Sequence, residues 1–107
     1  MIRPGDVVTV DFPGVTGVKR RPAVVVSTDV YQRTRPDVIL ALVTTKTGSA
    51  TQPSDYVLED SSTAGLHKPS AFRSFLFTLP AAAVIGHLSG RDWSGVQRAL
   101  KSAVVVD

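Results

Sequence analysis

Two short segments of the sequence each combine an apolar, strand-like run with side chains that can bind a phosphate. Cations precede the run of residues 23–26, and hydroxyl groups follow the run of residues 38–43. If these runs form paired strands, Arg21 and Thr44 lie together at one edge of a sheet. An arginine fork holds two phosphate oxygens and stays charged, and a threonine hydroxyl donates a further hydrogen bond. The pattern therefore predicts a site for nucleic acid.

The other residue types offer little alternative chemistry. The chain has no cysteine, and its two histidines, His67 and His87, lack the spacing of metal ligands. The nine carboxylates are dispersed singly, and no glycine-rich phosphate loop or nucleophile elbow is present. We therefore expect no metal and no cofactor, and we interpret His67 as a surface histidine. RNA cleavage would still be possible, because the 2′-hydroxyl of RNA can be the nucleophile while fixed cations and donors stabilise the phosphate.

Strands are predicted for most of the first two thirds of the chain. Alternating polar and apolar residues over 6–12 are typical of a half-buried strand. Continuous apolar residues over 22–27 and 38–43 indicate strands that are buried on both faces. The remaining predictions are a loop at 14–19, one helical turn within 28–36, strands at 56–58 and 71–78, a loop at 61–69 and a short helix at 81–88.

A C-terminal helix is predicted from Ser89 onward. Ser89 and Asp92 have the spacing of a capping box, and Trp93, Val96 and Leu100 follow as one apolar stripe. The expected fold is α+β, mostly β: a small antiparallel β-barrel or half-barrel with a C-terminal helix packed on it. Its core should include three phenylalanines, at positions 72, 75 and 77, the last two on one face.

Length and charge set broader limits. A chain of 107 residues predicts a single domain spanning residues 1–107, and a net charge of +3 permits an anionic partner. No signal peptide or membrane-spanning run is evident, so a cytoplasmic protein is expected.

The sequence resembles the MazF/PemK family, the toxin halves of type II toxin–antitoxin modules. Six landmarks occur in family order and cover nearly the whole chain: Gly5-Asp6-Val7-Val8-x-Val10-Asp11-Phe12, Arg21-Pro22-Ala23-Val24-Val25-Val26-Ser27, Val43-Thr44-Thr45, Gly65-Leu66-x-Lys68-Pro69-Ser70, Thr78, and Ile85-Gly86-x-Leu88-Ser89.

This resemblance implies an SH3-like barrel that forms a homodimer and acts as a metal-independent endoribonuclease on single-stranded RNA. It implies that Arg21 and Thr44 are catalytic and that the products carry a 2′,3′-cyclic phosphate and a 5′-hydroxyl. A cognate antitoxin would inhibit by passing a disordered segment across the same groove. The further candidate RNA-binding residues are Lys19, Arg20, Ser27, Arg33, Thr45 and Lys46.

Two segments depart from the family pattern. The loop before Arg21 is short and contains Val18-Lys19-Arg20 in place of a segment with an acidic residue, and residues 72–77 lack a glutamine. Two alternatives therefore stay open: a non-enzymatic toxin of the same fold that binds DNA gyrase, and a degenerate member that binds only antitoxin or nucleic acid. The tail after Ala103 has no aromatic residue, which disfavours the gyrase alternative.

Overall fold

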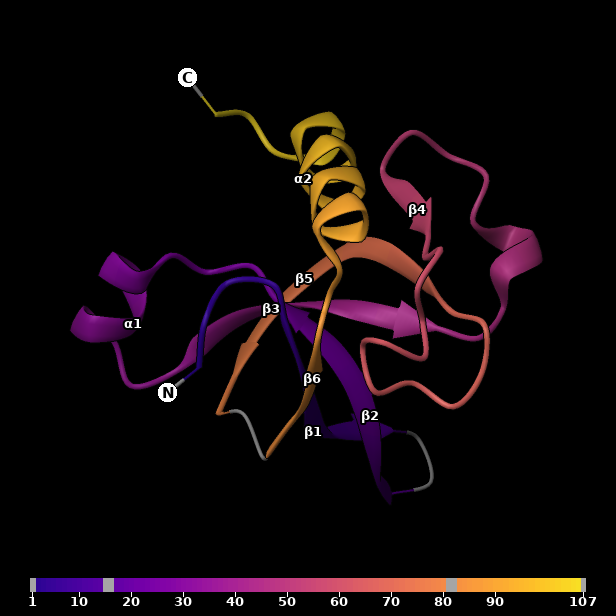
Figure 1. The fold of residues 1–107 in the computed structure, drawn as a ribbon. Coiled ribbons are helices and arrows are strands. Elements are labelled where there is room, and N and C mark those ends of the chain that lie inside the picture. The colour runs from indigo at the N-terminus through magenta and orange to yellow at the C-terminus, as the bar shows by residue number, and fades with distance from the viewer. Residues whose placement is uncertain (1, 15–16, 81–82, 107) are drawn as a thin grey trace.

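The structure is a computed structural model that describes residues 2–14, 17–80 and 83–106. Within these ranges, a six-stranded sheet carries a C-terminal helix on one side (Figure 1). The elements are β1 (Asp6–Gly14), β2 (Gly17–Val25), α1 (Asp29–Thr34), β3 (Val38–Thr44), the 3-10 turn η1 (Thr47–Ser49), β4 (Asp55–Val57), β5 (Ala71–Leu79), β6 (Ala83–His87) and α2 (Gly90–Ala103). The strand order is β4-β5-β3-β2-β1-β6, and every recorded pair is antiparallel.

The sheet curls on itself. Two strands separate β1 from β5 in the sheet, yet the rings of Phe12 and Phe77 lie 5.1 Å apart. The inner face therefore encloses its own apolar cluster, which contains Val8, Val10, Ala23, Val25, Val38 and Leu40. The prediction of a half-barrel with a C-terminal helix is confirmed.

Helix α2 covers the outer face of the sheet. Val7 of β1 and Val24 of β2 pack there with Val96 of α2 in a second buried cluster. Alternate residues of β2 point into the two clusters, which explains why its sequence is apolar without interruption. Of the three predicted core phenylalanines, Phe72 is buried on the outer face. Phe77 packs on the inner face, and Phe75 lies beside it but is 51% exposed.

The predicted start of α2 is confirmed. Ser89 is the N-cap, and its hydroxyl accepts a hydrogen bond from the backbone N–H of Asp92. The buried face of the helix contains Val96, as expected, but also Asp92 and two small residues, Gly95 and Ala99. A Cβ atom on Gly95 would lie 2.1 Å from the ring of Tyr56, so only glycine allows this close contact.

Two local predictions are wrong. Residues 83–87 of the predicted helix 81–88 form strand β6 instead, whereas residues 81 and 82 lie outside the described residues. Pairing with β1 overrides helical propensity here, because the sheet edge formed by β1 would otherwise keep unpaired backbone groups. Likewise, residues 17–19 of the predicted loop belong to β2, which pairs with β1 as far as Gly14 and Gly17. No helix in the described ranges is long and apolar enough to cross a membrane.

Candidate functional site

The pairing of β2 with β3 places the segments that carry Arg21 and Thr44 on neighbouring strands. The recorded pairs run from Val25 opposite Leu40 to Ala23 opposite Leu42, and they end two residues short of Arg21 and Thr44. The predicted pairing of these two strands is confirmed. The Arg21 side chain is exposed, and Thr44 is half-buried. The Thr44 hydroxyl accepts a hydrogen bond of 3.1 Å from the backbone N–H of Lys46 and keeps its own proton available to a ligand.

Arg20, the residue before Arg21, is paired with a carboxylate. Nε and Nη2 of Arg20 donate to the two carboxylate oxygens of Asp11, at 3.1 and 3.4 Å, directly across the β1–β2 pair. Arg21 forms no salt bridge to any residue that the structure describes. The two consecutive arginines therefore differ: Arg20 is held by a carboxylate, and Arg21 can offer its guanidinium to a phosphate.

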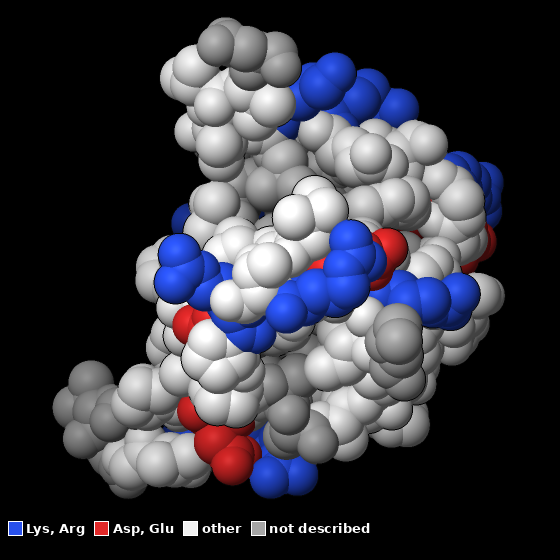
Figure 2. Space-filling view, turned by 90° about the vertical axis from the view of Figure 1, so that its left-hand side faces the viewer, with Lys and Arg blue, Asp and Glu red and all other residues white. Residues whose placement is uncertain are grey.

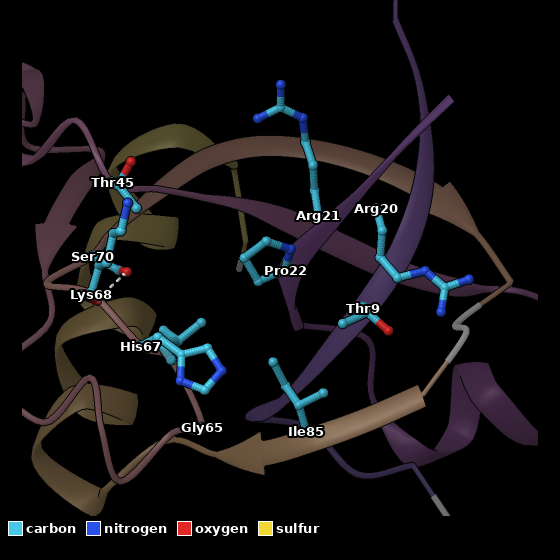
Figure 3. Close-up of a pocket in the computed structure, with 11 residues that line it drawn as sticks. Thr9, Arg20, Arg21, Pro22, Thr45, Gly65, His67, Lys68, Ser70 and Ile85 are labelled. Carbon is cyan, nitrogen blue, oxygen red and sulfur yellow. Dashed lines mark hydrogen bonds between the residues drawn. The ribbon is translucent and has the colours of Figure 1, made fainter. Parts of the chain in front are cut away.

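A pocket of about 750 Å³ opens beside Arg21 (Figure 3). Pro22, Leu66 and Ile85 supply apolar surface, and Arg21 and Lys68 supply cations. The pocket is also lined by Thr9, Arg20, Thr45, Gly65, His67 and Ser70. These lining residues, all from the described part of the chain, include no Asp or Glu, so the pocket suits a ligand that is partly apolar and partly anionic.

One wall of the pocket is the segment 65–70, which belongs to a loop held by a buried carboxylate. Asp92 is 0% exposed, and its Oδ1 accepts hydrogen bonds from the Tyr56 hydroxyl (2.8 Å) and the Glu59 N–H (2.9 Å). Its Oδ2 accepts one from the Asp60 N–H (2.8 Å). Burial, followed by the hydrogen bond to Asp92, raises the pKa of Tyr56 to about 12. The side chain of Asp92 thus joins helix α2 to the backbone N–H groups of Glu59 and Asp60, at the start of the loop.

A second contact between α2 and this loop is ionic. The Arg91 guanidinium donates to both oxygens of Asp60, at 2.9 and 2.8 Å, and the Ser89 hydroxyl donates to the same carboxylate at 2.6 Å. These hydrogen bonds, that of Arg91 first, lower the pKa of Asp60 to about 2. Ser89 therefore both caps the helix and binds the loop.

The far side of the loop lies directly on β6. A Cβ atom on Gly65, whose φ is +80°, would lie 2.2 Å from the carbonyl oxygen of Ile85. A Cβ atom on Gly86 would lie equally close to the carbonyl oxygen of Ala64. Two glycines thus allow the two backbones to touch, and they hold His67 and Ile85 on adjoining walls of the pocket.

The predicted RNA-binding residues do not all lie near this pocket. Arg20 and Thr45 line it together with Arg21, whereas Thr44, Lys19 and Lys46 are not among its lining residues. Ser27 is buried; its hydroxyl donates to Gln32 and accepts from the N–H of Ile39.

Arg33 lies on α1, where it lines a separate hollow of about 340 Å³ with Arg3. Figure 2 views the molecule from the side where α1 and the N-terminus lie in Figure 1, and it shows a row of Lys and Arg side chains across that face with a few acidic groups beside them. The hollow that Arg33 lines shares no residue with the pocket beside Arg21.

Sequence reasoning missed several pocket residues, notably Thr9, His67, Lys68 and Ile85. Lys68 and Ile85 stand in two of the family landmarks, which was a usable signal. His67 carried none, because its position in the pocket depends on the contact between its loop and β6.

Comparison with protein families decides the relationship. The sequence model described as "PemK-like, MazF-like toxin of type II toxin-antitoxin system" matches residues 3–104. The chain belongs to this family of toxins. None of the curated proteins compared with it matches this MazF/PemK-family chain in sequence.

Solved structures support the same fold. An endoribonuclease in complex with its cognate antitoxin, from a mycobacterial species, superposes with a TM-score of 0.77 at 19% identity, covering 96% of this chain and 94% of that one. Mycobacterium tuberculosis toxin MazF-mt6 gives 0.71 at 22% identity, covering 98% and 99%. A MazE-MazF structure from Deinococcus radiodurans gives 0.73 at 19% identity, covering 95% and 94%. This MazF/PemK-family chain therefore shares its whole architecture with those toxins.

Proposed function

We propose that this toxin is a metal-independent endoribonuclease that cleaves single-stranded RNA. The observation that carries the proposal is Arg21 itself: it has no carboxylate partner among the described residues, it lines a pocket with cations at its rim, and its strand pairs with the one that ends at Thr44. Family membership and the endoribonuclease identity of the mycobacterial structures support the same activity.

In the proposed reaction, the 2′-hydroxyl of one nucleotide gives up its proton as its oxygen attacks the adjacent phosphorus, and the 5′-oxygen takes up a proton as its bond to that phosphorus breaks. The products are a 2′,3′-cyclic phosphate and a 5′-hydroxyl. Arg21 holds the phosphate oxygens as negative charge accumulates on them, and the hydroxyl of Thr44 donates a hydrogen bond to the same group. Arg20 does not take this role, because its guanidinium is engaged by Asp11.

Two partners belong to the proposal. Exposed apolar side chains on β5 and β6, including Phe75 and Val84, supply surface for a homodimer. A cognate antitoxin would block the same RNA-binding surface, as expected for a family whose solved members include toxin–antitoxin complexes. Cleavage of messenger RNA in the cytoplasm would stop translation and growth.

The direct test incubates purified protein with single-stranded RNA in EDTA and maps the new 5′ ends. Arg21→Ala should lower the cleavage rate at least 100-fold, because loss of one fixed donor to the developing charge costs about 10²–10³ in rate. Arg20→Ala is the matched control, since it removes an equal charge from the neighbouring position and should change the rate less than tenfold.

Thr44 and Thr45 can be separated in the same assay. Thr44→Val should lower the rate, whereas Thr45→Val, at the pocket lining, should act mainly on RNA affinity. Intact RNA after exposure to the folded wild-type protein would refute the activity. RNA that binds with a steep salt dependence but stays uncut would instead indicate a degenerate member.

A further inference from the structure

We propose that the pocket beside Arg21 is a subsite for one unpaired nucleobase of the RNA, and that His67 is the side chain that reads this base. The inference rests on the proposed function for the identity of the ligand as RNA. It adds a specificity residue that no family landmark marks.

The shape and lining of the pocket fit a base joined to a phosphate. Its volume of about 750 Å³ lies within the range usual for small-molecule sites. Pro22 and Ile85 form apolar surface on either side of the opening in Figure 3, and Ile85 is 38% exposed although it is a β-branched apolar residue. An apolar surface that remains open to solvent favours the flat face of a base.

Cations are placed where the sugar–phosphate backbone would lie. Pro22 directly follows Arg21 in the chain, so a base that contacts Pro22 brings its own phosphate within reach of that guanidinium. Lys68 supplies a second cation on the opposite wall. A purely acidic peptide segment would use these cations but leave the apolar surface of Pro22 and Ile85 uncovered, whereas a nucleotide offers both a flat base and a phosphate.

His67 has the chemistry that base reading requires. Its imidazole extends from the loop toward Ile85 and Pro22 (Figure 3), and the hydrogen bonds recorded among the described residues include none to this ring. Neutral imidazole carries one donor and one acceptor, whereas the arginines and Lys68 can only donate. The flat ring can also stack on a base, a contact common in sequence-specific RNA recognition.

The backbone beneath His67 is held in place before RNA arrives. Gly65 is packed on the carbonyl of Ile85, and the Ser70 hydroxyl donates to the carbonyl of Lys68 at 2.8 Å. The Ser70 N–H is bound in turn by the hydroxyl of Ser61 at 3.2 Å. A side chain on a loop that is already ordered can discriminate between bases better, because little free energy is spent on ordering the loop when RNA binds.

The test measures binding without cleavage. RNA in which every residue is 2′-O-methylated has no free 2′-hydroxyl, so it cannot be cut by the proposed reaction. A tight-binding sequence is selected from a random pool of this RNA, and each of its positions is then replaced in turn by an abasic residue. Wild-type protein should lose about tenfold in affinity at one position, a size typical of a single stacked base.

The His67 variants give the decisive comparison. His67→Ala should bind the intact RNA about tenfold more weakly and show no further loss at that one abasic position, while losses at other positions persist. His67→Phe should keep the abasic loss but discriminate less among the four bases there. Arg33→Ala, which removes a cation that does not line this pocket, should reproduce the wild-type scan apart from a uniform electrostatic loss.

Other outcomes overturn the subsite. An unchanged abasic scan in His67→Ala, an equal loss for every oligonucleotide, or failure to select any RNA would each do so; the first is also the result expected if the pocket instead captures an antitoxin side chain. Selective loss at one position without any cleavage of natural RNA would leave the subsite standing and refute the ribonuclease.

Discussion

The buried carboxylate of Asp92 offers the sharpest test of how the pocket wall is held. Asp92→Asn keeps the shape of the side chain but replaces one acceptor oxygen by an NH₂ donor. Oδ1 accepts from Tyr56 and Glu59, and Oδ2 accepts from Asp60. Whichever way the amide is turned, at least one donor then faces another donor inside the protein.

The expected cost can be worked from these three bonds. A hydrogen bond to a charged group contributes about 1.5–3 kcal/mol. The variant loses at least one such bond and weakens the others by removing the charge. Its free energy of unfolding should therefore fall by about 3 kcal/mol. For a chain of this size, that corresponds to a fall in Tm of roughly 12 °C or more.

Urea denaturation followed by circular dichroism measures this difference. Asp11→Asn serves as the control, because it removes the same charge at an exposed ion pair and should cost less than about 1 kcal/mol. A loss below about 1 kcal/mol for Asp92→Asn would refute the reasoning. Binding of the selected RNA should also weaken in Asp92→Asn at temperatures where it remains folded.

Three further predictions concern the same wall. Gly65→Ala should lower the free energy of unfolding by about 2 kcal/mol or more, because its φ is left-handed and a Cβ there would lie 2.2 Å from a backbone oxygen. Gly48→Ala, where nothing lies within 4 Å of a Cβ, is the control and should be near neutral or stabilising in thermal unfolding. Folding raises the pKa of Tyr56 from 10.0 to about 12, so its contribution to stability is complete below pH 10 and is lost as the pH rises to about 12; Tyr56→Phe should remove this alkaline loss in urea titrations. Folding lowers the pKa of Asp60 from 3.8 to about 2, so the stability it shares with Arg91 is present above pH 4 and is lost as the pH falls toward 2; a wild-type acid transition that Asp60→Asn leaves unaltered would contradict this.

Elements that depend on local pattern were predictable from the sequence. The uninterrupted apolar runs gave the strands that carry Arg21 and Thr44, and the Ser89 capping pattern gave the start of α2. The antiparallel pairing of these two strands followed from the same runs.

Features set by distant contacts were not predictable in this way. Residues 83–87 form a strand because β1 offers them an edge, not because their own residues exclude a helix. Similarly, the ion pair between Arg20 and Asp11 forms only because the β1–β2 register places them opposite each other. The position of His67 in the pocket depends on the close backbone contact that glycines at positions 65 and 86 allow. The sequence contains these residues, but only the assembled sheet makes them neighbours.

The bonds from Asp92 to the loop also impose an order on biosynthesis. The Asp60 N–H must wait for an acceptor that is translated 32 residues later, so the loop cannot take its final position while the ribosome is still making the intervening chain. At the usual rate of synthesis this interval lasts roughly 2 to 6 seconds. A nascent chain therefore emerges with this wall of the pocket unfinished, and the wall is completed only after the codon for Asp92 has been read.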